Sequence, residues 1–301
     1  MDRRVEFDVE IEFTNGGGIQ GQGFRLDLAG DDIADTELAD YIVRDMRLLM
    51  VGPVRILNKR ILNEPHKRKP IDTRGGTAYV DLSHTIEHGV ITHKGLPAPI
   101  ICDYLSREAS RTRYAPGTEF QIGKIEMVAN TGTYIDCPFH RYADGKDLAQ
   151  TNIEAMSDLD ALVVRVDHRA MLAIGAEQFR NRELRGRAVL VHTGWDAHWN
   201  TPAYLENHPF LTEDAALYLR DCGVKLVGID SHNVDDTSSD DTRGNARPVH
   251  TILLGAEILI VEHLTNLGSL PDEGFAFSAV PPKFKGVGTF PVRAMARLRQ
   301  R

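Results

Sequence analysis

The chain has 301 residues, a net charge of -8, a pI near 5.8 and 42% hydrophobic residues. This length is sufficient for one large domain, or for a large domain with a small companion. Because the net charge is negative and most basic residues are dispersed, we expect no nucleic-acid partner. The sequence lacks a run of about 18 apolar residues, so we also expect no membrane span.

The cysteines and the first residues of the sequence indicate the cellular compartment of the protein. Cys102, Cys137 and Cys222 lie far apart and are odd in number, so they predict neither a disulfide framework nor a CxxC zinc site. Reduced thiols are typical of cytoplasmic proteins. The opening residues MDRRVEFDVEIEF lack the apolar segment of a secretory signal. We therefore expect a cytoplasmic protein.

The first 68 residues predict a small domain. Residues 5–13 alternate charged and apolar side chains as a strand does, residues 15–23 form a glycine-rich turn, and a returning strand follows. Apolar residues recur at helical spacing within residues 31–50, and residues 51–62 return to strand alternation. We expect a ββαβ unit of α+β type within residues 1–68, without a sequence feature that indicates its role.

A polar, basic segment broken by prolines and glycines follows the small domain. Such a composition is typical of an exposed linker, which we place at residues 69–77. The second domain is expected to span residues 78–301.

Short apolar strands dominate the second domain. Residues 212–223 predict a helix that ends at Gly223. Runs such as VLV, LVG and LIV are typical of strands covered on both faces, so we expect an α/β fold with layers around a central sheet. The expected strands lie within residues 79–83, 120–130, 161–167, 188–194, 224–230 and 257–264.

Polar residues gather where these strands end. The segments are NTGTYIDCPFHRYADG at 130–145, HTGWDAHW at 192–199, GIDSHNVDD at 228–236 and a stretch at 249–267. Each supplies His, Asp or Glu side chains that bind metals or transfer protons near neutral pH. Since α/β proteins bind ligands at strand ends, we expect a site there.

The order of these motifs resembles the cyclase, or kynurenine formamidase-like, family of metal-dependent hydrolases, which also contains isatin hydrolase. The family signature H-x-G-T-H-x-D-x-P-x-H is followed, more than a hundred residues later, by a His and a Glu twelve residues apart. Here the second part reads HTILLGAEILIVEHLTNL, with His250 and Glu262 at that spacing. YVDLSHTI, VHTGWDAHW and PPKFKGVGTFPVRAMA also match, so the resemblance covers residues 78–298.

The resemblance implies roles for particular residues. It implies Asp136, His250 and Glu262 as metal ligands and His140 as the proton-transfer residue. It also implies that His84 and His93 shape the substrate pocket and that the protein is a homo-oligomer.

The chain departs from the signature at two positions. Asn130 and Tyr134 stand where the signature has its first two histidines, which hold one of two metal ions in the family. An amide oxygen and a phenol with a pKa of about 10 are weaker ligands than imidazole. We therefore expect one divalent ion at most, Zn, Mn or Fe, held by one imidazole and two carboxylates.

These observations predict a hydrolase of carbon–nitrogen bonds in a small amide or cyclic amide. His140 would take a proton from water and return it to the leaving nitrogen, and Tyr134 would donate a hydrogen bond to the developing oxyanion. We expect the substrate to be bound by Asn130, Thr133, His84 and His232.

Two other functions stay open. In a metal-free lyase or isomerase, Asn130 and Tyr134 would bind the substrate while His140 and Asp136 perform acid–base chemistry. In a non-enzymatic protein, the same pocket would bind a small carboxylate-bearing molecule. His250 and Glu262 would then form a structural pair.

Overall fold

The structure is a computed structural model that describes residues 2–28, 32–46, 48, 50–64, 78–238 and 246–298. The chain divides into two compact units, residues 1–72 and 73–301. The predicted linker, residues 69–77, lies outside the described residues. Among the helices of the described ranges, none is long and apolar enough to cross a membrane.

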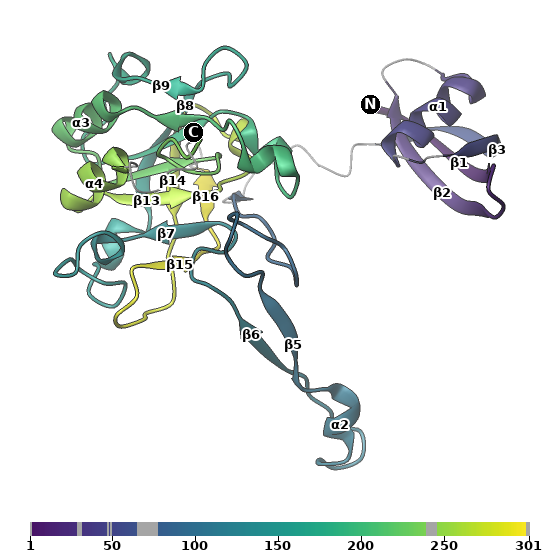
Figure 1. The fold of residues 1–301 in the computed structure, drawn as a ribbon, viewed down its shortest axis with the longest axis horizontal. Helices are drawn as coiled ribbons and strands as arrows, with labels where there is room; N and C mark the ends of the chain where they lie inside the picture. The colour runs from purple at the N-terminus through teal and green to yellow at the C-terminus, as the bar shows by residue number, and fades with distance from the viewer. Residues whose placement is uncertain are drawn as a thin grey trace. The chain divides into compact units, whose positions relative to one another are not determined.

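The first unit has the predicted ββαβ order (Figure 1). Its elements are β1 (Asp2–Phe13), β2 (Gly18–Leu28), α1 (Asp35–Asp45) and β3 (Val51–Glu64), and the antiparallel sheet has the order β2-β1-β3. Alternate side chains of β1, such as Phe7 and Ile11, form a core with Leu38 and Ile42 of α1. β2 begins inside the segment predicted as a turn, because Gly16 and Gly17, both at φ 89°, already reverse the chain.

The second unit is built on a nine-stranded mixed sheet, which confirms the predicted α/β class. The four strands β13, β12, β10 and β8 are parallel, and the strands outside them pair antiparallel. Across the sheet the order is β15 (Thr289–Pro291), β7 (Tyr134–Asp136), β13 (Leu259–Glu262), β12 (Leu226–Ile229), β10 (Ala188–His192), β8 (Leu159–Arg165), β14 (Glu273–Ser278), β16 (Met295–Leu298) and β4 (Tyr79–Asp81).

Two apolar cores lie on the two faces of this sheet. Helices α3 (Glu213–Cys222) and α4 (Pro248–Gly255) pack on one face, where Leu219 and Leu253 join alternate residues of the parallel strands. The predicted end of α3 is confirmed, because Gly223 caps it in the left-handed conformation. The shorter elements are β9 (Ala173–Ile174), β11 (Phe210–Leu211) and 3-10 helices at Pro138–His140, Ile153–Ala155, Ala176–Phe179, Trp195–His198, Pro202–Leu205 and Leu267–Ser269.

A hairpin extends away from the central sheet of the second unit (Figure 1). Its strands β5 (Ile100–Leu105) and β6 (Ile122–Glu126) form a two-stranded antiparallel sheet, with the short helix α2 (Arg107–Arg111) between them. All five residues of β6 are exposed. We call residues 100–126 the arm.

Candidate active site

The pairing of β7 with β13 builds the floor of a pocket. Tyr134 lies directly opposite Glu262 in the antiparallel register, and Asp136 follows two residues later on the same face of β7. All three side chains are buried. Residues more than 120 positions apart in the sequence thus bring two carboxylates and a phenol to one point of the sheet.

His250 is held in place by a third carboxylate. Its Nδ1 lies 2.6 Å from Asp235 Oδ2, and the Asp235 carboxylate also accepts the backbone N–H groups of Val249 and His250 at the start of α4. The other ring nitrogen, Nε2, lies 3.6 Å from Asp136 Oδ2 and 3.8 Å from Glu262 Oε1. A carboxylate that fixes the outer nitrogen of a ligating histidine is a common feature of metal sites.

Thr289 sets the tautomer of His140. The Thr289 hydroxyl donates to Asp136 and lies 2.7 Å from His140 Nδ1. Because a hydroxyl has one proton, Nδ1 must donate its own proton to Thr289, which leaves His140 Nε2 with a free lone pair. The backbone of Gly288 approaches that of His140 closely, since a Cβ at Gly288 would lie 2.3 Å from the backbone nitrogen of His140.

The donor atoms fit a divalent cation. Asp136, His140 and His250 each offer one ligand atom, and these atoms lie within 4.8 Å of one another. The buried Asp136 Oδ2 has no hydrogen-bond partner within the described part of the chain. A buried carboxylate oxygen normally has a partner, and a cation between it and His250 would supply one. Imidazole with carboxylate oxygens suits Zn, Mn or Fe.

The pKa values show how the site is charged without an ion. Burial lowers the pKa of His250, but the nearby Asp136 carboxylate and the hydrogen bond to Asp235 reverse this effect and raise it to about 10. Burial opposes ionisation of Asp136, yet the neighbouring His140 and His250 bring its pKa below 3.8. Burial, together with the charge of Asp136, raises the pKa of Glu262 to about 7. A metal ion at His250 must therefore displace a proton.

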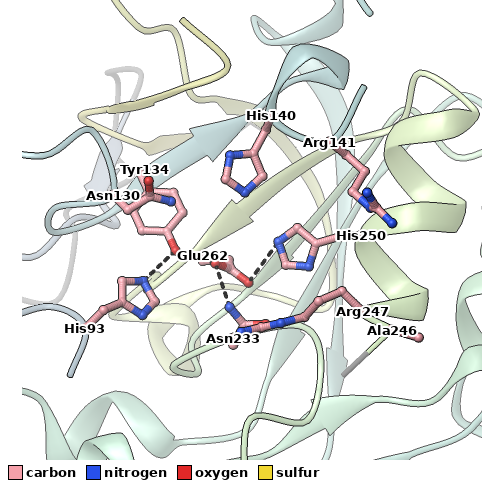
Figure 2. Close-up of a pocket in the computed structure, with 10 residues that line it drawn as sticks. All are labelled: His93, Asn130, Tyr134, His140, Arg141, Asn233, Ala246, Arg247, His250 and Glu262. Carbon is pink, nitrogen blue, oxygen red and sulfur yellow. Dashed lines mark hydrogen bonds and ion pairs between the residues drawn. The ribbon is translucent and has the colours of Figure 1, made fainter. Parts of the chain in front are cut away.

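Tyr134 lies between Glu262 and His93. Its hydroxyl donates to Glu262 Oε2 and lies 2.8 Å from His93 Nε2 (Figure 2). Burial, followed by the charges of Glu262 and Asp136, raises the phenol pKa well above 10. The phenol is therefore protonated at neutral pH, and it is a hydrogen-bond donor and not an anionic ligand.

The pocket above these residues has a volume of about 440 Å³. Two arginines in its wall, Arg141 and Arg247, provide positive charge, and Arg247 also donates to Asn233 at 2.8 Å. Guanidinium groups in a pocket wall suit a ligand with a carboxylate. Figure 2 shows the ten lining residues: His93, Asn130, Tyr134, His140, Arg141, Asn233, Ala246, Arg247, His250 and Glu262.

Most of the residues singled out in the sequence meet at this pocket. Asn130, Tyr134, His140, His250 and Glu262 line it, and Asp136 is buried in contact with His140 and His250.

The other three predicted substrate-binding residues lie outside the pocket lining. The Thr133 hydroxyl donates to the carbonyl of His263 and accepts the backbone N–H of His84, so its position is structural. The His84 ring stacks on Trp199 with ring centroids 4.0 Å apart. His232 is buried beside His93 and His263.

Sequence reasoning missed Asn233, Asp235, Arg141, Arg247 and Thr289. Asp235 lies in the GIDSHNVDD segment, where a carboxylate partner for a histidine was to be expected. Nothing in the sequence distinguishes it from its acidic neighbours.

Comparisons with known proteins are consistent with this geometry. Residues 80–236 match the model of the Cyclase family, described as "putative cyclase". A kynurenine formamidase of Geobacillus thermodenitrificans (strain NG80-2) is 30% identical over 190 residues, which cover 62% of this chain and 86% of that protein. A kynurenine formamidase of Bacillus cytotoxicus is 28% identical over 220 residues, covering 73% and 97%.

Solved structures share the fold of the second unit. Isatin hydrolase A from Ralstonia solanacearum superposes with a TM-score of 0.64 at 23% identity, covering 75% of this chain and 94% of that chain. An isatin hydrolase bound to the product analogue thioisatinate has a TM-score of 0.62 at 20% identity, covering 74% and 92%. At these identities the likeness concerns the fold alone.

Proposed function

Because the chain belongs to the Cyclase family, we propose that it is a metal-dependent hydrolase of a carbon–nitrogen bond in a small amide or cyclic amide. The relatives named kynurenine formamidase support this reaction class. The observation that carries the proposal is the buried, unpartnered Asp136 oxygen 3.6 Å from His250 Nε2, beside a pocket within the described ranges.

Asp136, His250 and Glu262 would hold one divalent ion, Zn, Mn or Fe. When bound, the ion would polarise the substrate carbonyl and lower the pKa of water. Two hydrogen bonds fix the orientation of the Glu262 carboxylate: the Val234 N–H donates to Oε1 at 2.7 Å, and the Tyr134 hydroxyl donates to Oε2.

His140 performs the proton transfers. Its Nε2 lone pair takes a proton from the attacking water and returns it to the leaving nitrogen, while Thr289 keeps the ring in the required tautomer. Asn130 provides a hydrogen-bond donor for an oxygen atom of the substrate, whereas the Tyr134 proton is already donated to Glu262 Oε2.

The two arginines narrow the substrate class. Arg141 and Arg247 line the pocket on the side of α4, and their charge would bind an anionic group of the substrate (Figure 2). We therefore propose an amide that also has a carboxylate. A carboxylate offers two acceptor oxygens to a planar guanidinium, whereas a neutral amide offers one.

The ligand and base assignments are tested by metal analysis of variants purified without chelators. His250→Gln should lose the ion, because it removes the one imidazole of the ligand set. His140→Ala should keep the ion but lower turnover of an N-aryl formamide by about a hundredfold or more, the contribution of a general base. The exposed His88 gives a control, His88→Ala, which should change neither property.

Two results would overturn these assignments. An unchanged metal content in His250→Gln would exclude His250 as a ligand. Loss of the ion from His140→Ala would make His140 a ligand, a result compatible with its place in the Asp136 and His250 group.

One observation favours a metal-free alternative. The pKa of His250, raised to about 10, makes it a stable partner for Asp136 and Asp235 without an ion. A lyase, isomerase or small-molecule-binding protein would then use the pocket. Full activity in protein stripped of metals would support the lyase or isomerase, and ligand binding without turnover would support the binding protein.

A further inference from the structure

A second group of histidines lies beside the pocket, where His93 and His263 contact the Tyr134 ring. His93 precedes the arm, His232 follows β12 and His263 follows β13. One ring nitrogen of each lies within 4.8 Å of the others. His232 is 5% exposed and His263 is fully buried. None of the three belongs to the group of Asp136, His140 and His250.

The spacing of the three rings matches that of a tetrahedral metal site. With Zn–N distances of about 2.0–2.1 Å, ring centres lie about 3.2 Å from the ion and hence about 5 Å from one another. The ring centroids of His93, His232 and His263 are 4.7, 5.2 and 5.6 Å apart. The rings thus already have nearly the separations that a common ion imposes.

The hydrogen bonds leave a lone pair on His93 and one nitrogen without a partner on each of the other two rings. The Tyr134 phenol donates its proton to Glu262, so it must accept a proton from His93 Nε2, and His93 Nδ1 keeps a lone pair. His263 Nδ1 lies 2.8 Å from the Tyr204 hydroxyl, while its Nε2 is buried. Neither this Nε2 nor the buried Nδ1 of His232 has a hydrogen-bond partner among the described residues.

An unpartnered buried nitrogen is costly, because it loses its hydrogen bonds to water without gaining others. The rings are neutral as well, because burial lowers the pKa of His93 to about 4, that of His232 to about 2 and that of His263 well below 6.5. Neutral imidazole is the form that binds transition metals. A cation would satisfy the nitrogens that the protein leaves without partners.

We propose that His93, His232 and His263 bind a divalent transition-metal ion such as Zn²⁺, in a site separate from Asp136 and His250. Tyr134 and Tyr204 orient two of the rings through hydrogen bonds to the nitrogens that do not face the ion. Since His93 also lines the pocket, the ion lies beside it. This proposal does not depend on the hydrolase proposal, because it uses different ligands.

His208 provides a contrast within the same cluster of rings. The ring centroids of His208 and His232 lie 5.1 Å apart. Both ring nitrogens of His208 nevertheless have hydrogen-bond partners, Pro209 O at 3.0 Å and Thr237 Oγ1 at 2.7 Å. His208 is therefore a buried histidine without a free lone pair. It supplies a matched control for substitution of its neighbours.

Cobalt binding to the full chain tests the proposal, because Co²⁺ in tetrahedral nitrogen coordination absorbs strongly in the visible range. We expect the metal-stripped parent to develop this absorption when Co²⁺ is added. The variants His93→Gln and His232→Asn should lack the absorption and should bind about one equivalent of Co²⁺ less than the parent. His208→Gln and His250→Gln should keep it. His93 is the more exposed ligand, so its variant should fold, as circular dichroism would verify.

Parent-like Co²⁺ absorption and stoichiometry in both His93→Gln and His232→Asn would overturn the proposal. The experiment also separates this site from the proposed catalytic ion. If the parent binds one Co²⁺ that His93→Gln loses and His250→Gln retains, the three-histidine site stands and the Asp136 and His250 site does not. The reverse pattern rejects the three-histidine site.

Discussion

At the residue scale, the protonation of the site depends on single hydroxyl groups. Thr289 donates to Asp136 and thereby makes His140 present an unprotonated Nε2 to the pocket. Tyr134 does the same between Glu262 and His93. The family resemblance implied that Asp136, His140, His250 and Glu262 would share one site. It did not predict Thr289, because one threonine in a loop-rich C-terminal segment has no distinguishing pattern.

Removal of the Thr289 hydroxyl tests this account of His140. Thr289→Val should lower kcat by about tenfold to a hundredfold, because the ring loses the partner that fixes its tautomer. The value of KM and the metal content should remain close to those of the parent. Thr289→Ser keeps the hydroxyl and should restore most of kcat. An unchanged kcat in the valine variant would show that Thr289 does not orient the base.

At the element scale, the sequence predicted α3 and the strands β4, β8, β10, β12 and β13 well, because the apolar runs and the Gly223 stop are local signals. It did not predict a strand within residues 130–145. This segment contains β7, a three-residue strand whose pairing with β13 places Tyr134 opposite Glu262. Such pairing is non-local and leaves no periodic pattern in so short a strand. The arm was also missed, although its second strand lies within a predicted one.

The arm exposes apolar surface that another protein surface could cover. An isolated two-stranded hairpin is at best marginally stable in water, and the arm exposes large apolar side chains, among them Tyr104 at 75% and Ile125 at 62%. We propose that a second copy of the chain covers it, in a homo-oligomer of the kind that the family resemblance implies.

Charges on the arm should therefore weaken self-association. Tyr104→Asp combined with Ile125→Asp should lower the molar mass measured by light scattering, because burying a carboxylate opposes association. Lys124→Ala, a change at an exposed position of the same strand, should leave the mass unchanged. A parent-like mass in the double variant would exclude the arm as the interface.

At the scale of the whole molecule, the second unit contains many neutral buried histidines. Burial lowers the pKa values of His84 and His93 from 6.5 to about 4, and those of His208, His232 and His263 are lowered as well. Composition and motifs predicted the α/β class, the small N-terminal unit and the family. They did not predict this clustering, since the histidines come from separate loops.

The clustering predicts how stability depends on pH. Between pH 6.5 and about 4 the unfolded chain binds protons at these histidines and the folded chain does not, so the free energy of unfolding falls as the pH falls. Each histidine contributes about 1.4 kcal/mol per pH unit within its window. Glu262 and Asp230, with pKa values raised to about 7, and His250, with its pKa raised to about 10, act in the opposite sense but are fewer than the five histidines.

Urea unfolding of metal-stripped protein at pH 7 and pH 5 measures this effect. The midpoint should be lower at pH 5, and the difference should shrink in His84→Gln, which removes one of the groups. Equal midpoints at the two pH values would mean that the buried histidines are protonated in the folded state.

The central claim is that the pocket hydrolyses a carbon–nitrogen bond with the aid of a divalent ion. The most direct measurement is the rate of hydrolysis of a carboxylate-bearing N-aryl formamide by metal-stripped protein as Zn²⁺ or Mn²⁺ is added. We predict negligible hydrolysis at the start and a rate that rises to saturation with the added ion. Hydrolysis at the full rate by protein that retains less than about a tenth of an equivalent of metal would contradict the claim.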